Sequence, residues 1–279
     1  MTQRHDREPE AGSTPVRNGQ PVRLVAVVVT HNRLAQLKRT LARLMDSPPA
    51  HLAAVVVVDN ASDDGTAAWL AAQADGPAGA RLIVARLAEN RGGAGGFAHG
   101  MDLALGRGRA DWLVVMDDDA RPEPGALARF HARDLRGWDA VAAAAHHPDG
   151  RICEMNRPTL NPFWHPKVFA RTAMGGGRGA FHLGPADYAR PGPMLVDGAS
   201  FVGLFVARGA ITRAGLPRAE LFLYGDDAIW TLELSRAGGR IGFFPAIRFE
   251  HDSATLGTGD GRFRPLWKVY YYHRYLLIL

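Results

Sequence analysis

Short apolar runs alternate with amphipathic segments along the first half of the chain. The runs at residues 24–29, 54–58, 82–84 and 113–116 are rich in β-branched residues and end in polar residues, as buried strands do. After the first run, leucines recur at helical spacing and predict a helix that stops before Pro48. This alternation predicts βαβ units, and therefore an α/β fold whose mostly parallel central sheet is flanked by helices. The leucines are Leu34, Leu37, Leu41 and Leu44.

Polar clusters follow three of these strands at the point where each strand ends. The carboxyl ends of parallel strands share one edge of a sheet, and ligands bind beyond that edge. The three clusters therefore predict a nucleotide-type site. They are Thr30-His31-Asn32-Arg33, Asp59-Asn60-Ala61-Ser62 and Asp117-Asp118-Asp119.

Three consecutive carboxylates end the run at residues 113–116. Side chains alternate across a strand, so Asp117 and Asp119 point one way and Asp118 the other. Three neighbouring anions repel one another, and a hard divalent cation such as Mg²⁺ or Mn²⁺ would relieve that repulsion. A solvated acidic loop that caps the next helix explains the same residues, and this stretch by itself leaves both interpretations open.

A glycine-rich stretch at residues 89–97 leads into a helix that reaches about Leu105. Its backbone N–H groups and the helix N-terminus can hold phosphate, through residues such as Gly92 and Gly93. The stretch also satisfies the loose G-x-G-x-x-G/A pattern, so an NAD(P)- or flavin-dependent oxidoreductase that uses the loop at residues 92–96 is the alternative function. Polar residues separate the glycines from the preceding strand, and a ribose needs one acid where this chain offers three, which counts against the alternative.

The second half of the chain predicts further elements in a less regular order. Helices are expected at residues 126–133, 207–214 and 226–238, and strands at residues 139–145, 196–203 and 241–246. Residues 146–196 are irregular and rich in Pro, Gly, His and aromatic residues, and a segment of that length either moves or binds something. Trp164 and His165 either line an acceptor groove or pack this segment onto the core.

Two aspartates stand at the predicted start of the helix at residues 226–238. Asp226 occupies the position expected for an N-cap, and Asp227 follows one step further in. Adjacent helical positions face different ways, so we expect Asp226 to anchor the helix and Asp227 to face the cleft. The alternative is that both carboxylates simply stabilise the helix N-terminus.

Composition narrows the classes of function. The 279 residues carry a formal net charge of +5 from dispersed basic residues, so nucleic-acid binding is not expected. The single cysteine, Cys153, excludes an intrachain disulfide and a cysteine-based zinc site. We find no apolar run long enough to span a membrane and no secretory signal, and we expect a cytoplasmic protein.

Residues 1–21 are expected to be a disordered tail, and residues 261–279 an aromatic, basic helix that is interfacial or truncated.

Taken in order, the motifs resemble family 2 glycosyltransferases over roughly residues 22–252. The resemblance is closest to the galactofuranosyltransferase and rhamnosyltransferase branch, and implies a GT-A fold at residues 22–260. Its nucleotide-sugar-binding half would be residues 22–145 and its acceptor-binding half residues 146–260. The motifs are Thr30-His-Asn32-Arg33, Asp59-Asn60-Ala-Ser-Asp-Asp-Gly-Thr66, Glu89-Asn90-Arg-Gly-Gly-Ala-Gly-Gly96, Asp117-Asp118-Asp119 and Gly225-Asp226-Asp227.

The resemblance also implies roles for individual residues. Asp117, Asp119 and His251 would hold Mn²⁺ or Mg²⁺, and Asp227 would be the general base of an inverting transfer from a UDP- or dTDP-sugar to a glycan or lipid-linked glycan acceptor. The chain has Gly225-Asp226-Asp227 where the family commonly has a Glu-Asp pair, which leaves the choice of base between Asp226 and Asp227 open. A non-catalytic sugar-nucleotide binding module is disfavoured, because binding alone needs no base. The donor would contact Thr30, Asn32, Arg33, Asp59, Asn60, Asn90, Gly92, Gly93 and Asp118, and the acceptor Trp164, His165 and Asp226.

The same resemblance suggests where the protein works. It implies cell-envelope polysaccharide or glycolipid synthesis, at the cytoplasmic face of a membrane that the C-terminal helix could touch. Neither the donor sugar nor the oligomeric state follows from the sequence.

Overall fold

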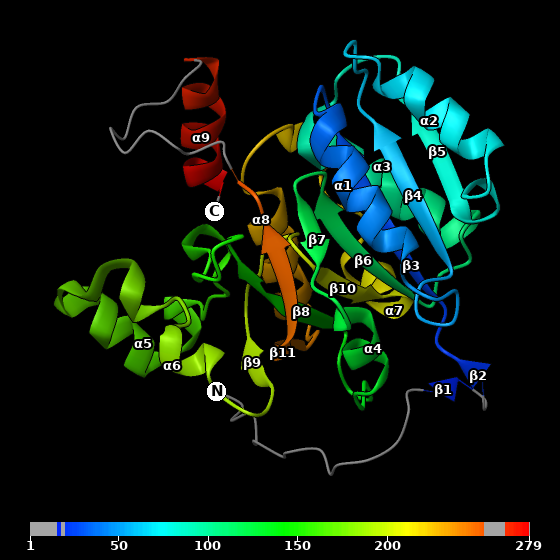
Figure 1. The fold of residues 1–279 in the computed structure, drawn as a ribbon. Helices are drawn as coiled ribbons and strands as arrows, with labels where there is room; N and C mark the ends of the chain where they lie inside the picture. The colour runs from blue at the N-terminus through cyan, green and yellow to red at the C-terminus, as the bar shows by residue number, and fades with distance from the viewer. Residues whose placement is uncertain (1–15, 18–19, 254–265, 279) are drawn as a thin grey trace.

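The computed structural model describes residues 16–17, 20–253 and 266–278. A nine-stranded sheet forms the middle layer, and helices cover both of its faces (Figure 1). The strand order is β5-β4-β3-β6-β10-β8-β11-β7, and β9 pairs with β11. The strands are β3 (Leu24–Thr30), β4 (Ala54–Asp59), β5 (Leu82–Arg86), β6 (Trp112–Asp117), β7 (Ala120–Pro122), β8 (Ala140–His146), β9 (Met194–Val196), β10 (Leu204–Ala207) and β11 (Ile241–His251). The helices are α1 (Leu34–Met45), α2 (Thr66–Asp75), α3 (Gly92–Gly106), α4 (Ala126–His131), α5 (Pro166–Arg171), α6 (Pro185–Tyr188), α7 (Arg208–Ala214), α8 (Asp226–Arg236) and α9 (Trp267–Ile278).

The first four sheet strands confirm the βαβ prediction. β5, β4, β3 and β6 are parallel, with helices in the connections between them. β3 is buried along its whole length because helices cover both faces. One face of the sheet packs on α1, α2 and α4, and the other on α3, α7 and α8.

The sheet as a whole is mixed. β10 lies antiparallel between β6 and β8, and β11 runs parallel to β8. A single strand was expected at residues 196–203, but the chain is extended in β9 and again in β10, and a mostly buried loop joins them. In that loop Gly203 has a φ of +71°, which breaks a continuous strand and turns the chain into β10.

The strand predicted at residues 241–246 is longer than expected. β11 continues through a register irregularity between Phe244 and Arg248 and ends at His251. Its last residues pair with β7, a three-residue strand that the sequence did not predict. The sequence does not predict β7, because Ala-Arg-Pro has neither an apolar run nor an alternation of apolar and polar residues.

The glycine-rich stretch is helical where a loop was expected. α3 begins at Gly92, so Gly93, Gly95 and Gly96 lie in its first turns. A Cβ at Gly96 would stand 2.5 Å from Cγ1 of Val29, and one at Gly100 would stand 2.5 Å from Cγ1 of Val27. At these two positions glycine permits close packing of α3 on the sheet.

The ends of the chain agree with the predictions only in part. Within the expected tail at residues 1–21, Val16–Arg17 and Gln20–Pro21 pair as antiparallel strands β1 and β2. Residues 1–15 and the predicted domain boundary at residue 260 lie outside the described residues. α9 confirms a C-terminal helix over residues 267–278. Within the described ranges, none of the helices combines the length and apolar character that a membrane span requires.

Candidate active site

Strand register brings three predicted site residues to one edge of the sheet. Thr30 lies opposite Asp59 in the β3–β4 pair, and Val29 lies opposite Asp117 in the β3–β6 pair. The carboxyl ends of β3, β4 and β6 therefore meet at one place, as the sequence predicted.

Asp118 is buried beneath this edge. Its Oδ2 accepts a hydrogen bond from the Thr30 hydroxyl at 2.7 Å, and Nη1 of Arg33 lies 3.4 Å from its Oδ1. Burial raises the pKa of Asp118 to about 6, while the bond from Thr30 and the charge of Arg33 oppose that rise. Thr40 of α1 donates a 2.7 Å hydrogen bond to the backbone carbonyl of Asp118 and fixes the turn. The sequence analysis did not single out Thr40.

Asp119 lies between two cationic side chains. Nη1 of Arg33 donates to its Oδ2 at 2.6 Å, and Nε2 of His251 lies 3.3 Å from its Oδ1. Burial would raise the pKa of Asp119, but His251 and Arg33 outweigh it and hold this pKa below its usual value. Oδ1 of Asp119 is buried and makes no hydrogen bond of good geometry to the residues that the structure describes.

His251 reaches Asp119 through the β7–β11 pair. His251 lies opposite Ala120, and the backbone N–H of Asp252 donates to the carbonyl of Asp119 at 2.9 Å. Burial lowers the pKa of His251, but Asp119 more than compensates and the pKa rises to about 10. The Asp119 carboxylate therefore favours the protonated form of this imidazole.

Asn156 and Cys153 complete the surroundings of His251. Nδ1 of His251 donates to Oδ1 of Asn156 at 2.7 Å, and Sγ of Cys153 lies 3.6 Å from the same nitrogen. Nδ2 of Asn156 in turn donates to the Ser200 hydroxyl at 3.0 Å. Both residues come from the irregular segment at residues 146–196, and no local pattern marks them in the sequence.

Asp117 is half-buried at the end of β6. Burial, with repulsion from Asp119 and Asp118, raises its pKa to about 7. Such a carboxylate is held in an unfavourable anionic environment that a divalent cation would stabilise.

The donor set suits a hard cation but is not assembled around one. Asp117, Asp119 and His251 supply the oxygen and nitrogen ligands that Mn²⁺ accepts, and the buried Oδ1 of Asp119 lacks a good hydrogen bond. In the described part of the chain, however, no three His, Cys, Asp or Glu side chains are placed to coordinate an ion together. Arg33 and His251 provide the positive charge beside Asp119 instead.

The second pair of acids lies at the start of α8. Gly225, with a φ of +77°, occupies the N-cap position that was expected for Asp226, and no side chain caps the helix. The Asp227 carboxylate accepts backbone hydrogen bonds from Ala228, at 2.7 Å, and from Phe201. Burial raises the pKa of Asp227.

Asp226 is the member of the pair that is repelled by the acidic cluster at the end of β6. Burial, followed by repulsion from Asp227 and Asp117, raises the pKa of Asp226 well above its usual value. Its Oδ2 lies 4.0 Å from where a Cβ on Gly93 would stand, at the N-terminus of α3. Backbone N–H groups at the start of α8 contact both carboxylates, but the contact from Phe201, outside the helix, belongs to Asp227.

The residues after β4 form a rigid, hydrogen-bonded corner. Asp59 is fully buried; its Oδ1 accepts from the backbone of Ser62 at 2.9 Å, and Nε of Arg86 lies 3.6 Å from its Oδ2. Asn60 donates to the carbonyl of Gly92 at 2.9 Å and accepts from the backbone N–H of Arg91 at 2.8 Å. Asn60 therefore ties the end of β4 to the start of α3.

Two other residues that were predicted to contact the nucleotide-sugar donor form hydrogen bonds that hold loops together. Asn32, at a φ of +54°, accepts from the backbone of Asp63 at 2.8 Å, and its own N–H donates to the Ser62 hydroxyl at 3.0 Å. Asn90 accepts from the N–H of Gly92 at 2.9 Å, where α3 begins. Their side chains organise the edge of the site through these bonds.

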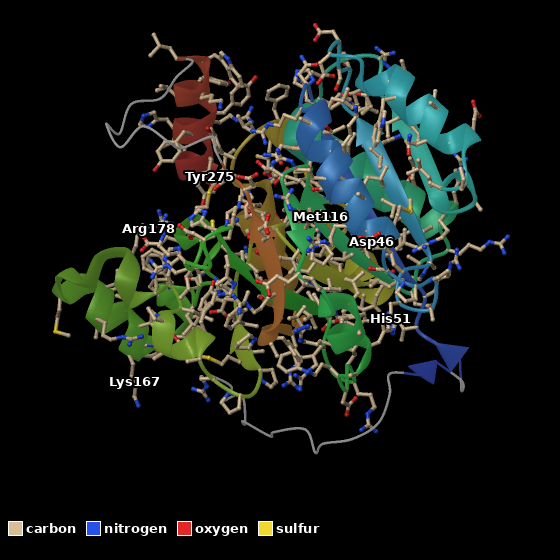
Figure 2. The ribbon with its side chains drawn as sticks, viewed as in Figure 1. Asp46, His51, Met116, Lys167, Arg178 and Tyr275 are labelled. Carbon is tan, nitrogen blue, oxygen red and sulfur yellow. The ribbon has the colours of Figure 1, made fainter. Side chains whose placement is uncertain are left out.

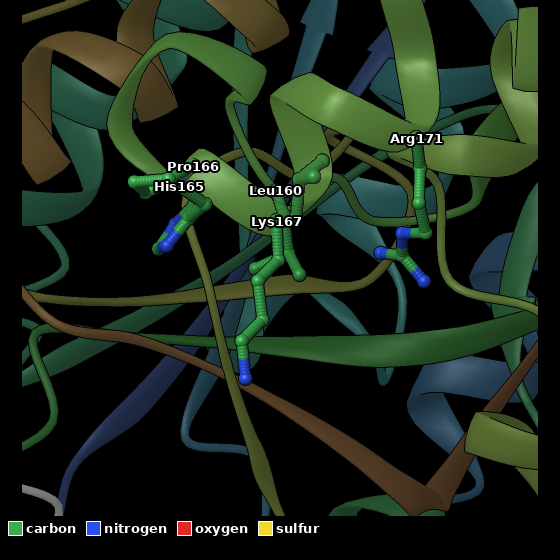
Figure 3. A pocket seen from close by; sticks show the side chains of 6 residues that line it. Leu160, His165, Pro166, Lys167 and Arg171 are labelled. Atoms are coloured by element: carbon green, nitrogen blue, oxygen red, sulfur yellow. The ribbon is translucent and has the colours of Figure 1, made fainter. Parts of the chain in front are cut away.

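Two of the three residues predicted to contact the acceptor, Trp164 and His165, lie in the segment at residues 146–196. His165 is within 2.6 Å of the buried Asp197 through Nε2, while Trp164 is 40% exposed. His165 lines a cavity of about 670 Å³ beside α5 (Figure 3). None of the acidic residues at the strand ends lines this cavity, so it is a separate feature of the surface.

Comparison with known proteins identifies the class. The model of the family described as "Glycosyl transferase family 2" matches residues 25–182, more than half of the chain. The chain therefore belongs to glycosyl transferase family 2. This assignment confirms the resemblance inferred from the motifs and displaces the oxidoreductase alternative.

Two relatives show which kinds of glycosyltransferase the chain is similar to. Galactofuranosyltransferase GlfT1 of Mycobacterium tuberculosis is 30% identical over 254 residues, which cover 86% of this chain and 72% of that protein. The undecaprenyl-phosphate mannosyltransferase of Micrococcus luteus is 31% identical over 156 residues, which cover 55% of this chain and 61% of that protein.

Among solved structures, mannosyltransferase PcManGT from Pyrobaculum calidifontis, in complex with GDP-Man and Mn²⁺, has a TM-score of 0.56 at 20% identity. The match covers 85% of this chain and 58% of that one. GalNAc-T7 with UDP, GalNAc and Mn²⁺ has a TM-score of 0.58 at 14% identity, over 82% of this chain and 44% of that one. These likenesses confirm the predicted α/β fold of the GT-A type.

Proposed function

We propose that this protein is an inverting, metal-dependent glycosyltransferase that moves a sugar from a UDP- or dTDP-sugar to a hydroxyl of a glycan or glycolipid. The observation that carries the proposal is the juxtaposition at the sheet edge of Asp117, with a pKa near 7, and the Arg33–Asp119–His251 cluster. A site that concentrates carboxylates beside a parallel-sheet edge suits a diphosphate and its counter-cation.

The donor would bind across the N-terminal half of the sheet. Asp59, buried and facing Arg86, is proposed to meet the nucleotide base, and Asp118 the ribose or sugar. Thr30 orients Asp118 through its 2.7 Å bond. Gly92 and Gly93 present the N-terminus of α3, where a phosphate is stabilised by free N–H groups and the helix dipole. Asn32, Asn60 and Asn90 hold this surface in shape.

Asp117, Asp119 and His251 would hold Mn²⁺ or Mg²⁺, which would neutralise the charge of the leaving diphosphate. Arg33, within 2.6 Å of Asp119, is placed to exchange that partner for a phosphate oxygen when the donor arrives. The raised pKa of His251 means that this imidazole must lose a proton before it acts as a ligand.

Asp227 is the proposed general base. The acceptor oxygen forms a bond to the anomeric carbon while the bond from that carbon to the phosphate oxygen breaks, and the acceptor proton passes to the Asp227 carboxylate. The nucleoside diphosphate leaves, and one displacement inverts the anomeric centre. Burial makes Asp227 more basic than a solvated carboxylate, and the N–H groups of Ala228 and Phe201 fix its orientation. Asp226, Trp164 and His165 would lie on the acceptor side.

Galactofuranose is the favoured donor sugar and rhamnose the second. The galactofuranosyltransferase relatives match 86% of this chain, more than the mannosyltransferase relative does, and this supports a UDP-linked donor. The same relatives support a role in cell-envelope polysaccharide or glycolipid synthesis. The enzyme would act at the cytoplasmic face of a membrane, which exposed residues of α9 such as Trp267 and Tyr270 could touch.

The test is isothermal titration of the protein with UDP and with dTDP, with and without Mn²⁺. The wild type is compared with an Asp117→Ala/Asp119→Ala variant, and Asp134→Ala serves as a control at an exposed ion pair away from the site. Metal-dependent binding of one nucleotide that disappears in the double variant supports the proposal and selects the donor class. Binding of neither nucleotide under any condition contradicts it.

A further inference from the structure

Large apolar side chains are exposed together around α5. Phe163 is 83% exposed and Met174 is 78% exposed, and Phe169 is half exposed. Phe163 and Phe169 contact each other, with ring centroids 6.1 Å apart. We call Phe163, Lys167, Phe169, Arg171 and Met174 the α5 surface. Apolar side chains grouped in this way on a soluble face mark a surface that meets something apolar.

The charge of the same region has one sign. Residues 155–186 contain no Asp or Glu, but contain Arg157, Lys167, Arg171 and Arg178. Lys167 projects from α5 away from the sheet (Figure 2). Lys167 and Arg171 extend from the helix to the same side (Figure 3). The cations therefore border the exposed apolar groups without neighbouring acids in the sequence to neutralise them.

Two cavities are lined in part by residues of the α5 surface. One, of about 670 Å³, is lined by Leu160, Lys167, Val168 and Arg171 among others, and the second, of about 410 Å³, by Arg171, Met174 and backbone at Gly175–Gly176. Arg171 borders both. The irregular turn after α5 has Gly175 at a φ of +90°, which leaves Met174 at an exposed corner.

We propose that the α5 surface docks the protein on an anionic phospholipid bilayer. Phe163, Phe169 and Met174 would enter the boundary between headgroups and acyl chains, and Lys167 and Arg171 would pair with lipid phosphates. An interface with a folded protein would more often combine apolar groups with both signs of charge, whereas Lys167 and Arg171 complement a surface of one negative sign.

Docking through α5 also places the catalytic half of the molecule. The segment that carries this surface contributes Asn156 to the His251 environment and His165 to the buried Asp197. The membrane would then lie beside the segment that carries Trp164 and His165, to which the proposed function assigns the acceptor. This consequence for the acceptor rests on the proposed function, but the binding of lipid does not.

The experiment is co-sedimentation with vesicles of phosphatidylglycerol and phosphatidylcholine, against vesicles of phosphatidylcholine alone. The variants are Phe163→Ser/Phe169→Ser/Met174→Ser and Lys167→Gln/Arg171→Gln. A matched control, Leu216→Ser/Arg107→Gln, removes an exposed apolar group and a cation elsewhere. We expect binding of the wild type to anionic vesicles, a loss of roughly tenfold or more in each α5 variant, and no change in the control.

Three results would overturn the proposal. They are wild-type protein that ignores anionic vesicles, α5 variants that bind like wild type, and loss of binding in Trp267→Ser/Tyr270→Ser alone, which would move the contact to α9. If gel filtration shows that the α5 variants dissociate an oligomer while vesicle binding persists, the surface joins two copies of the chain instead. Far-UV circular dichroism of every variant reports on folding, and UDP binding reports separately on the proposed transferase site.

Discussion

Nδ1 of His251 donates a 2.7 Å hydrogen bond to Oδ1 of Asn156, 95 residues earlier in the chain. The bond occupies one ring nitrogen and leaves Nε2 facing Asp119. In metal sites, a partner of this kind fixes the orientation of a histidine ligand and raises its basicity. Asn156 is thus the residue that prepares His251 for the role proposed here.

Replacement of Asn156 by Ala should weaken metal binding more than it weakens the fold. Loss of a partner that orients a ligand typically costs about 10–100-fold in metal affinity. Titration of Mn²⁺ in the presence of UDP measures the effect. Asn161→Ala is the control, because Asn161 lies in the same segment but caps the backbone of Phe163. Equal Mn²⁺ affinity in the Asn156 variant and the wild type would show that His251 needs no such support.

Asp227→Asn should remove transfer while donor binding persists. An amide cannot take the acceptor proton, and the loss of a general base lowers turnover by roughly 10²–10⁴-fold. Asp226→Asn is the matched variant one residue away, and nucleotide titration checks that both still bind the donor. Should Asp226→Asn lose turnover and Asp227→Asn keep it, the roles of the two aspartates are reversed.

Gly96→Ala should destabilise the protein through a steric conflict. The new Cβ would stand 2.5 Å from Cγ1 of Val29, inside a packed layer, and such overpacking costs about 1–3 kcal/mol in the free energy of unfolding. Gly106→Ala, at the end of the same helix with nothing within 4 Å of the new Cβ, should be neutral or mildly stabilising. Urea denaturation measures both.

A second replacement tests the cause of the Gly96 effect. Val29→Ala removes the methyl groups that the new Cβ would meet, so Gly96→Ala should cost less in the Val29→Ala background than in the wild type. An identical cost in both backgrounds would rule out the contact with Val29 as the reason.

Acid should destabilise the protein partly through His182. Burial lowers the pKa of His182 to about 4, whereas the pKa in the unfolded chain is about 6.5. Below pH about 6.5 the unfolded chain binds a proton that the folded protein refuses, so this contribution to stability is present above that pH and is lost as the pH falls toward about 4.

Denaturation of wild type and His182→Gln at pH 7 and pH 5 measures that contribution. The wild type should lose more stability between the two pH values than the variant does. His273→Gln, at an exposed imidazole, is the control. A pH dependence that is the same in the His182 variant and the wild type would contradict the assignment.

Local pattern sufficed to predict the sheet strands of the N-terminal half and the edge at which the polar residues after them meet. β3, β4 and β6 are continuous apolar runs because helices cover both faces of the sheet, and this double burial is visible in the sequence. The polar residues that end these runs had to meet at one edge, because parallel strands point the same way. The sequence alone therefore places Thr30, Asp59 and Asp117 in one group.

Tertiary structure decided the contacts that depend on distant pairing. β7 is three residues long and forms only because β11 lies beside it, and this pairing carries His251 to Asp119. Asn156 reaches His251 through an irregular segment that has no periodicity to interpret. The spacing of the glycines in α3 is local information, and it predicted a phosphate-binding loop. The reason for Gly96 and Gly100 is not local, because the methyl groups of Val29 and Val27 that require them belong to another element. The spacing of apolar residues along a segment predicts which of its faces is buried. Which elements it packs against is decided by the packing of the whole chain.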